Sequence, residues 1–249
     1  MSDTTIDDML GGKVRITQPA RGYRAGTDAV LLAATIPTNA AGHALDVGCG
    51  VGAIGLLAMG RVKQLKMTGL EQDGFVADLA RQNLADNQFS NRAVILHGDL
   101  FSNDHGLEVE SFDRVITNPP YFSRQHHQSD DYRVRARTLP ENITLAQWAY
   151  QSLLLVRHGG WLHMVLPAQD LPEILVMMDG RAGNILCKPV LPKSGQPANR
   201  ILLAARRNAK GPFQLLSPLV MHEHDGSYSA QAKAIARDGE MLEDFSKLC

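Results

Sequence analysis

Hydrophobic positions along the chain fall into two alternating patterns. Short apolar runs that end in glycine or acidic residues are typical of buried strands, and the longer amphipathic stretches between them are typical of helices. The predicted strands cover 43–47, 66–70, 93–97, 112–117, 161–166, 185–190 and 200–205. The predicted helices cover 28–35, 53–60, 74–87, 145–157 and 169–181. This alternation predicts a doubly wound α/β fold, with a mostly parallel sheet of seven strands and helices on both faces.

The pattern also sets the expected domain organisation. Because no repeat, low-complexity tract or long linker interrupts it, we expect one domain over 1–249. Within it, an N-terminal segment (1–42) precedes the core (43–210), and a C-terminal extension (211–249) follows. Charged side chains throughout the first thirty residues argue against a signal peptide, and no apolar run approaches the length of a membrane span. These features predict a soluble, cytoplasmic protein; nothing in the sequence indicates an oligomeric state.

Composition and charge change the picture in two places. Cys49, Cys187 and Cys249 lie far apart and without ligand spacing, so we expect neither a disulfide framework nor a metal site. The formal net charge is -1, yet 180–222 contains no Asp or Glu. Basic residues are gathered there, namely Arg181, Lys188, Lys193, Arg200, Arg206, Arg207 and Lys210. This asymmetry is compatible with an RNA-facing surface or with an ordinary solvated face.

A glycine-rich loop is expected between the first strand and the helix that follows it. Gly48, Gly50 and Gly52 alternate in the sequence Asp46-Val-Gly-Cys-Gly-Val-Gly, and Cys49 occupies a place where a small side chain is needed. Glycines at this spacing let the backbone pass close beneath a ligand. The GxGxG spacing differs from the GxGxxG of a dinucleotide fold, and a plain turn remains the alternative.

Carboxylates follow the next two predicted strands. Glu71, with Gln72 beside it, comes after the second strand, and a carboxylate at that distance from the loop can accept hydrogen bonds from ribose hydroxyls. Asp99 follows the third strand, next to Leu100, and can accept a hydrogen bond from an exocyclic amine. Either carboxylate alone could be a helix cap, but such features at three successive strand ends indicate a nucleoside site.

These segments resemble the cofactor motifs of class I S-adenosylmethionine methyltransferases, whose core is a Rossmann-like sheet. The resemblance rests on Asp46 to Gly52, on Gly69-Leu-Glu-Gln-Asp73 and on Gly98-Asp99. It implies that the glycine loop lines the methionine part, which Asp46 reaches through water or the ammonium group. It further implies that Glu71 holds the ribose, and Asp99 with Leu100 the adenine.

A second constellation, Asn118-Pro119-Pro120-Tyr121, leaves the fourth predicted strand. The lone pair of an aromatic amino group is delocalised into the ring, so its two N–H groups must be held to direct it at a methyl donor. The amide oxygen of Asn118 and the carbonyl of Pro119 can accept them. Pro120 restricts the residue before it and so holds that carbonyl still, while Tyr121 offers a face on which a base can stack. A plain turn is the alternative.

The tetrad is similar to that of amino methyltransferases acting on adenine N6, cytosine N4 or glutamine N5. Further segments, 23–32 with Gly26-Thr27-Asp28, 199–204 and Tyr228-Ser229, resemble the bacterial tRNA1(Val) (adenine-N6) methyltransferase family over nearly the whole chain. The resemblance implies S-adenosylmethionine as cofactor and, as substrate, the tRNA adenosine immediately 3′ of the anticodon. It also implies that Gly26, Thr27 and Asp28 belong to the cofactor site, although Asp28 could equally cap a helix.

Other residues and functions stay open at this point. Arg124, in the polar stretch 124–137, could grip phosphates, as could Arg200, Arg206 and Arg207; a solvated loop is the alternative for 124–137. A release-factor glutamine methyltransferase would need a helical substrate domain for which the 44 residues before Leu45 leave little room. A cofactor-binding module without catalysis is the non-enzymatic alternative. His222 and His224 have no third ligand nearby, which favours surface residues over a metal site.

Overall fold

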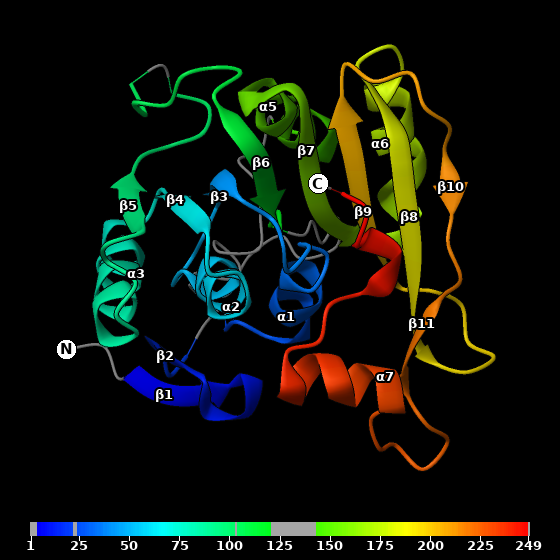
Figure 1. Ribbon diagram of the computed structural model, residues 1–249, viewed down its shortest axis with the longest axis horizontal. Coiled ribbons are helices and arrows are strands. Elements are labelled where there is room, and N and C mark those ends of the chain that lie inside the picture. The colour runs from blue at the N-terminus through cyan, green and yellow to red at the C-terminus, as the bar shows by residue number, and fades with distance from the viewer. Residues whose placement is uncertain (1–3, 22–23, 103, 121–142, 249) are drawn as a thin grey trace, which may run out of the picture.

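The computed structural model describes residues 4–21, 24–102, 104–120 and 143–248. Its centre is a sheet of nine strands in the order β10-β8-β9-β7-β6-β3-β4-β5, with β11 also paired to β8 (Figure 1). The strands are β3 (Gly42–Val47), β4 (Leu65–Glu71), β5 (Ala93–His97), β6 (Phe112–Thr117), β7 (Val156–Pro167), β8 (Ala182–Lys193), β9 (Arg200–Arg207), β10 (Gln214–Leu215) and β11 (Leu219–His222).

Pairing within this sheet is parallel except along β9. Strand β9 runs antiparallel to both β7 and β8. Only six residues separate the end of β8 from the start of β9, which suits a hairpin connection and is too short for a helical crossover. The carboxyl ends of the parallel strands therefore share one edge of the sheet, which positions the loops that follow them for ligand binding.

Helices cover both faces of the sheet (Figure 1). Helices α1 (Thr27–Ala33), α2 (Ala53–Arg61) and α3 (Gly74–Asp86) contribute to one apolar cluster, together with the C-terminal segment around Phe245. Helices α5 (Leu145–Leu155) and α6 (Leu171–Met178) contribute to a second cluster on the opposite face. The sheet is thus buried on both sides, as the continuous apolar runs of its strands require.

The structure confirms the predicted doubly wound, mostly parallel sheet and corrects its strand count. All seven predicted strands are present, and those over 93–97 and 112–117 have the predicted bounds. The short strands β10 and β11 are additional and make the sheet nine-stranded. Both lie in the C-terminal extension, where each pairs with β8 over only two or three residues. Strands this short carry too few apolar positions to show a pattern in the sequence.

Two predicted helices are shorter than expected. The helix predicted to reach 157 ends at Leu155, because β7 begins at Val156 and continues to Pro167. The helix predicted over 169–181 is replaced by a 3-10 turn, Ala168–Asp170, followed by α6. Pro172 lies in the first turn of α6, a position that a proline tolerates because its missing N–H has no helical partner there.

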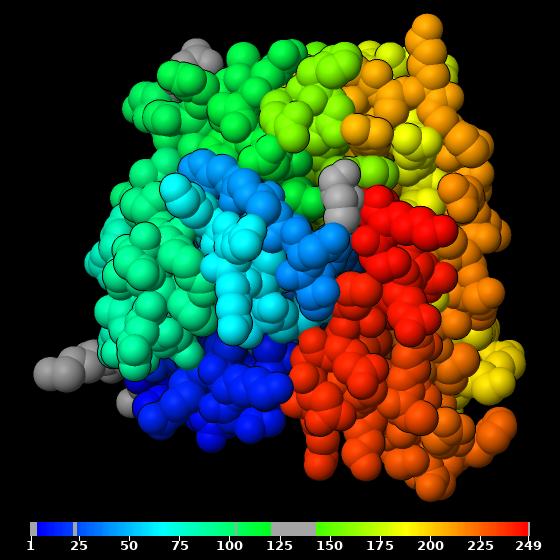
Figure 2. All heavy atoms as spheres, viewed as in Figure 1, coloured from blue at the N-terminus to red at the C-terminus, as the bar shows by residue number. Residues whose placement is uncertain are grey.

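A β-hairpin in the N-terminal segment was not predicted. Strands β1 (Thr4–Met9) and β2 (Val14–Pro19) pair antiparallel, joined by a 3-10 turn at Leu10–Gly12. The hairpin packs between α3 and the C-terminal segment, where it appears in blue in Figure 2. Its strands are rich in Thr, Asp and Gln and lack the apolar runs by which the other strands were found.

The chain ends in a short helical segment. Helix α7 (Ala230–Lys233) begins after Ser229, whose hydroxyl accepts a hydrogen bond from the Ala232 N–H and donates one to the Val220 carbonyl. A π-helical turn, Ala234–Asp238, and a 3-10 turn, Glu243–Phe245, follow. Over the described ranges, no helix combines the length and the apolar character that crossing a membrane would need.

Candidate functional site

A cavity of about 240 Å³ opens at the carboxyl ends of β3, β4, β5 and β6. Its lining combines segments that are far apart in the sequence but follow neighbouring strands. The lining residues are Pro19, Ala25, Ala29, Gly48, Cys49, Gly50, Val51, Ala53, Ile54, Leu70, Glu71, Gln72, Asp73, Val76, Gly98, Asp99, Leu100, Asn118, Pro119, Pro120 and Trp148. The structure thus brings together the glycine loop, the two carboxylates and the Asn-Pro-Pro segment singled out in the sequence.

The glycine loop leaves β3 in a conformation that only glycine adopts readily. Gly48, Gly50 and Gly52 have φ angles of 67°, 56° and 83°. The Gly48 and Cys49 amides both donate to the Leu70 carbonyl, which ties the loop to the end of β4. A Cβ at Gly50 would meet no protein atom within 4 Å and would point into open space. Gly50 therefore leaves room for a ligand against the backbone, whereas a Cβ at Gly48 would press on the ring of Trp148.

Glu71 connects the glycine loop to the start of α3. Its Oε2 accepts a hydrogen bond from the Gly50 N–H at 2.8 Å, and its Oε1 accepts one from the Asp73 N–H at 2.9 Å. Burial raises the pKa of this carboxyl group, and the two backbone donors oppose that shift. Each oxygen keeps a second lone pair, so the carboxylate can still accept hydrogen bonds from a ligand in the cavity.

Asp46 lies behind the glycine loop and not on the cavity wall. Its side chain is fully buried, and neither carboxylate oxygen meets ordinary hydrogen-bond geometry with a partner in the described part of the chain. Burial, partly opposed by the Gly55 backbone N–H and assisted by the charge of Glu71, raises the pKa of Asp46 to about 7. A buried carboxyl group of this kind is poised to respond to a positive charge placed near it.

The remaining predicted residues of the nucleoside site and the tetrad divide into two groups. Asp99 and Leu100 line the cavity, and the Asp99 carboxylate accepts a hydrogen bond from the Phe101 N–H. Asn118, Pro119 and Pro120 line the cavity from the end of β6. Tyr121 and Arg124 lie outside the described residues, as does the rest of the polar stretch.

The predicted Gly26-Thr27-Asp28 segment borders the cavity without lining it. Gly26 is the N-cap of α1, and the lining residues are its neighbours Ala25 and Ala29. Asp28 lies inside the first turn of α1, where its charge suits the helix dipole, and it forms an ion pair with Arg200 at 3.2 Å. The alternative role of Asp28 as an N-cap is therefore wrong.

Trp148 is a site residue that none of the sequence motifs includes. It is 8% exposed, lies on α5 and lines the cavity. Its Nε1–H donates to the Thr117 hydroxyl at 2.9 Å, and that hydroxyl donates to the Val47 carbonyl at 3.0 Å. Trp148 thereby contacts Gly48 with its ring and holds Thr117, the residue before Asn118, by a hydrogen bond. A tryptophan among apolar neighbours gives no sign of this double role in the sequence.

Arg206 and Arg207 lie at the opposite edge of the sheet, so the structure does not bring them to the cavity. Arg206 and Arg207 are paired with Gly183 and Ala182 at the amino end of β8, and Arg206 donates to the Gly159 carbonyl. Arg207 is 8% exposed and donates to the carbonyls of Leu154 and Val156 and to the Glu110 carboxylate. Its contacts join α5 to β7. Arg200, in contrast, lies at the carboxyl edge beside Asp28.

Cys49 lies in the glycine loop, and His222 and His224 lie in the C-terminal extension. Burial raises the pKa of the Cys49 thiol well above its usual value, so the group stays protonated within the loop. Among the residues that the structure describes, no three His, Cys, Asp or Glu side chains are grouped closely enough to hold a metal ion. His222 stacks on Tyr228 at a ring distance of 4.8 Å, and His224 is exposed.

Comparison with known proteins agrees with this architecture. The family model described as "Methyltransferase small domain" matches residues 24–139, which include the glycine loop, Glu71, Asp99 and Asn118. A predicted O-methyltransferase from Agrobacterium tumefaciens has a similar structure, with a TM-score of 0.71 and 24% identity, over 86% of this chain and 98% of that one. The fold and the matched segment place the chain among the Rossmann-like methyltransferases.

Curated relatives define the family more closely. A Yersinia enterocolitica protein is 30% identical over 86% of this chain and 85% of its own length. A Porphyromonas gingivalis protein is 35% identical, and this chain spans 64% of that relative's length. Both carry the name tRNA1(Val) (adenine(37)-N6)-methyltransferase. The chain belongs to the tRNA1(Val) (adenine(37)-N6)-methyltransferase family.

Proposed function

We propose that this protein transfers a methyl group from S-adenosylmethionine to the N6 amino group of adenosine 37, immediately 3′ of the anticodon, in tRNA1(Val). The observation that carries the proposal is one shared cavity, in which Asn118 and Pro119 face the glycine loop and Glu71. Relatives with this substrate in their names support the choice of base and RNA. A tRNA substrate implies an enzyme that works in the cytoplasm.

The cavity fits S-adenosylmethionine on grounds of its own geometry. Gly50 leaves space against the backbone that a Cβ would fill, and Glu71 offers acceptors for ribose hydroxyls. Asp99 and Leu100 would border the adenine, while the buried carboxyl group of Asp46 lies behind the loop on which the cationic end would rest. The bound cofactor supplies an electrophilic methyl group on a sulfonium centre.

The chain's part in the reaction is to hold an amino group in one orientation. The Asn118 amide oxygen and the Pro119 carbonyl would each accept one N–H of the adenine N6, which directs the nitrogen lone pair toward the cofactor site. Trp148 and Thr117 form a buried support beneath this segment. Because the proline after Pro119 confines its backbone, the carbonyl is held before the substrate arrives.

The substrate can be tested directly. Total tRNA from a strain that lacks the enzyme is incubated with the protein and S-adenosylmethionine, and the digested nucleosides and fragments are read by mass spectrometry. We expect N6-methyladenosine at position 37 of tRNA1(Val). Methylation of another base or of a ribose oxygen in place of this product, or no methylation of the tRNA at all, would contradict the proposal.

A further inference from the structure

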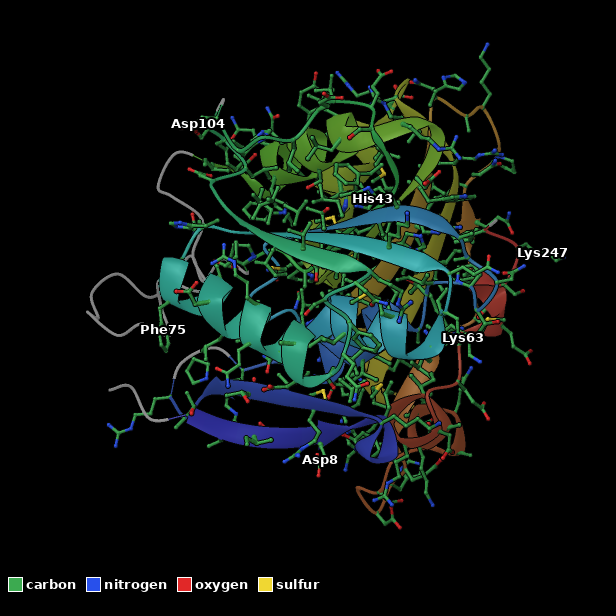
Figure 3. All side chains as sticks on the ribbon, turned by 60° about the vertical axis from the view of Figure 1, so that its left-hand side comes forward. Asp8, His43, Lys63, Phe75, Asp104 and Lys247 are labelled. Atoms are coloured by element: carbon green, nitrogen blue, oxygen red, sulfur yellow. The ribbon has the colours of Figure 1, made fainter. Side chains whose placement is uncertain are left out.

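Two asparagines of α3 hold the N-terminal hairpin, and one of them also bonds to the cofactor cavity. Strands β1 and β2 run alongside α3, as Figure 3 shows with Asp8 on the hairpin and Phe75 at the start of the helix. The Asn83 side chain accepts a hydrogen bond from the Thr17 N–H and donates one to the Thr17 carbonyl, both at 2.8 Å. Asn87 repeats this arrangement with the N–H and carbonyl of Arg15.

The spacing of Asn83 and Asn87 along α3 matches the spacing of Thr17 and Arg15 along β2. Residues four apart on a helix are about 6 Å apart along its axis, and residues two apart on a strand are about 6.6 Å apart. An asparagine amide offers one acceptor and two N–H donors, so it can satisfy both backbone groups of one strand residue. The two side chains thus take the place of a neighbouring strand along the free edge of β2.

Asn83 differs from Asn87 in one contact. Its side-chain nitrogen also donates to the Val51 carbonyl at 3.0 Å, and Val51 belongs to the glycine loop and lines the cavity. Asn83 is fully buried, and every hydrogen-bonding group of its amide is engaged. Asn87 instead donates to the Asn83 carbonyl within the helix. Of these two asparagines, it is Asn83 that connects the hairpin to the loop.

The hairpin also bonds to Arg24 and Ala25, which precede α1, and Ala25 lines the cavity. Gln18, which is 1% exposed, accepts a hydrogen bond from the Ala25 N–H and donates one to Asp7. Arg24 reaches back to Asp7 and to the Thr5 hydroxyl. Since Pro19 and Ala25 line the cavity, the hairpin forms one of its walls.

We propose that Asn83 is a positioning residue for the cofactor, which sets the glycine loop against the hairpin so that the two close around S-adenosylmethionine. The inference rests on the proposed function, because it assumes that cofactor. It assigns the N-terminal hairpin to cofactor binding. An arm that binds RNA would have no need of a buried link to the glycine loop.

Asn83→Ala and Asn87→Ala are a matched pair, because each removes two hydrogen bonds to one residue of β2. Asn83→Ala also removes the donor to the Val51 carbonyl. We expect Asn83→Ala to weaken S-adenosylmethionine binding about tenfold in calorimetry, and Asn87→Ala to weaken it less than about twofold. At saturating cofactor, the turnover number of Asn83→Ala should stay within about twofold of the wild type. Hydrogen exchange in the cofactor-free protein should rise over 48–52 in Asn83→Ala alone.

The possible outcomes separate the two proposals. Equal affinity losses in both variants, or unchanged affinity in a folded Asn83→Ala protein, would overturn the role of Asn83. A wild-type protein that binds no S-adenosylmethionine would overturn the proposed function itself. If Asn83→Ala does not fold, Gln18→Leu cuts the other link between hairpin and cavity, and wild-type affinity in that variant would overturn the hairpin's role.

Discussion

The two edges of the central sheet use charged side chains in opposite ways. At the carboxyl edge, Glu71 accepts hydrogen bonds from backbone N–H groups while it lines a cavity, and Asp46 is buried behind the glycine loop near the Gly55 N–H. At the amino edge, Arg207 is almost fully buried and bonded to two carbonyls and a carboxylate. Carboxylate oxygens at the carboxyl edge can still accept hydrogen bonds from a ligand, whereas the donors of Arg207 are bonded to other parts of the fold. Arg207 thus shows that a basic residue of the acid-free segment 180–222 can serve the fold, while Arg200 of the same segment lies at the carboxyl edge.

The largest effect expected from this comparison is at Asn118. Asn118→Ala should lower the turnover number by about two orders of magnitude or more, because a contact that orients the amino group is worth about 3 kcal/mol. Cofactor affinity should change little, since the glycine loop and Glu71 remain. Steady-state kinetics at saturating substrates and calorimetry measure the two quantities. Asn118→Asp keeps an acceptor and should retain part of the activity; wild-type turnover in Asn118→Ala would refute the mechanism.

A smaller effect is expected at Glu71. Glu71→Ala should weaken S-adenosylmethionine binding by about 1 to 3 kcal/mol, because the ribose hydroxyls lose a charged acceptor and Gly50 loses its partner. Calorimetry gives the affinity, and circular dichroism checks that the variant is folded. Glu71→Gln keeps one acceptor oxygen, so its affinity for S-adenosylmethionine should lie between those of the wild type and of Glu71→Ala. Wild-type affinity in folded Glu71→Ala would show that this carboxylate only caps the loop.

The pH dependence of binding should report on Asp46. Its pKa of about 7 lies above the usual value, so the folded protein keeps a proton there that the unfolded chain loses near pH 4. The contribution of Asp46 to the free energy of unfolding therefore falls as the pH rises from about 4 to 7. A cationic cofactor favours the ionised form, so its affinity should be about tenfold weaker at pH 6 than at pH 8. Asp46→Asn should remove that difference; an unchanged profile would contradict the assignment.

The smallest expected effect on activity distinguishes Arg200 at the carboxyl edge from Arg207 at the amino edge. Arg200→Ala should raise the Michaelis constant for tRNA a few-fold and flatten its salt dependence, as expected for one lost phosphate contact. Arg207→Ala should leave that constant unchanged and lower the free energy of unfolding by about 1 to 3 kcal/mol, because buried carbonyls lose their donors. Kinetics across a salt series and urea denaturation distinguish the two. A raised Michaelis constant in Arg207→Ala would restore the phosphate-binding role suggested by the sequence.

The sequence by itself determined seven of the nine strands of the sheet and the loops that follow β3, β4, β5 and β6 into the cavity. Strands β5 and β6 were predicted to the residue from their short apolar runs, although β5 is an edge strand whose Val94 is exposed. The glycine loop, Glu71, Asp99 and Asn118 were found because they follow successive strands, and parallel topology brings such loops to one edge. Both inferences need only local pattern and chain order.

Only the tertiary structure decided which residues support or surround those loops. The hairpin β1–β2 has no apolar run that would predict it, and its free edge bonds to Asn83 and Asn87 from α3, which lie more than sixty residues away. Trp148 reads as core in the sequence and proves to hold Thr117 and border Gly48. Arg200 and Arg207 share one strand, yet its ends lie at opposite edges of the sheet. Long-range contacts of this kind depend on how the elements pack, which local sequence patterns do not record.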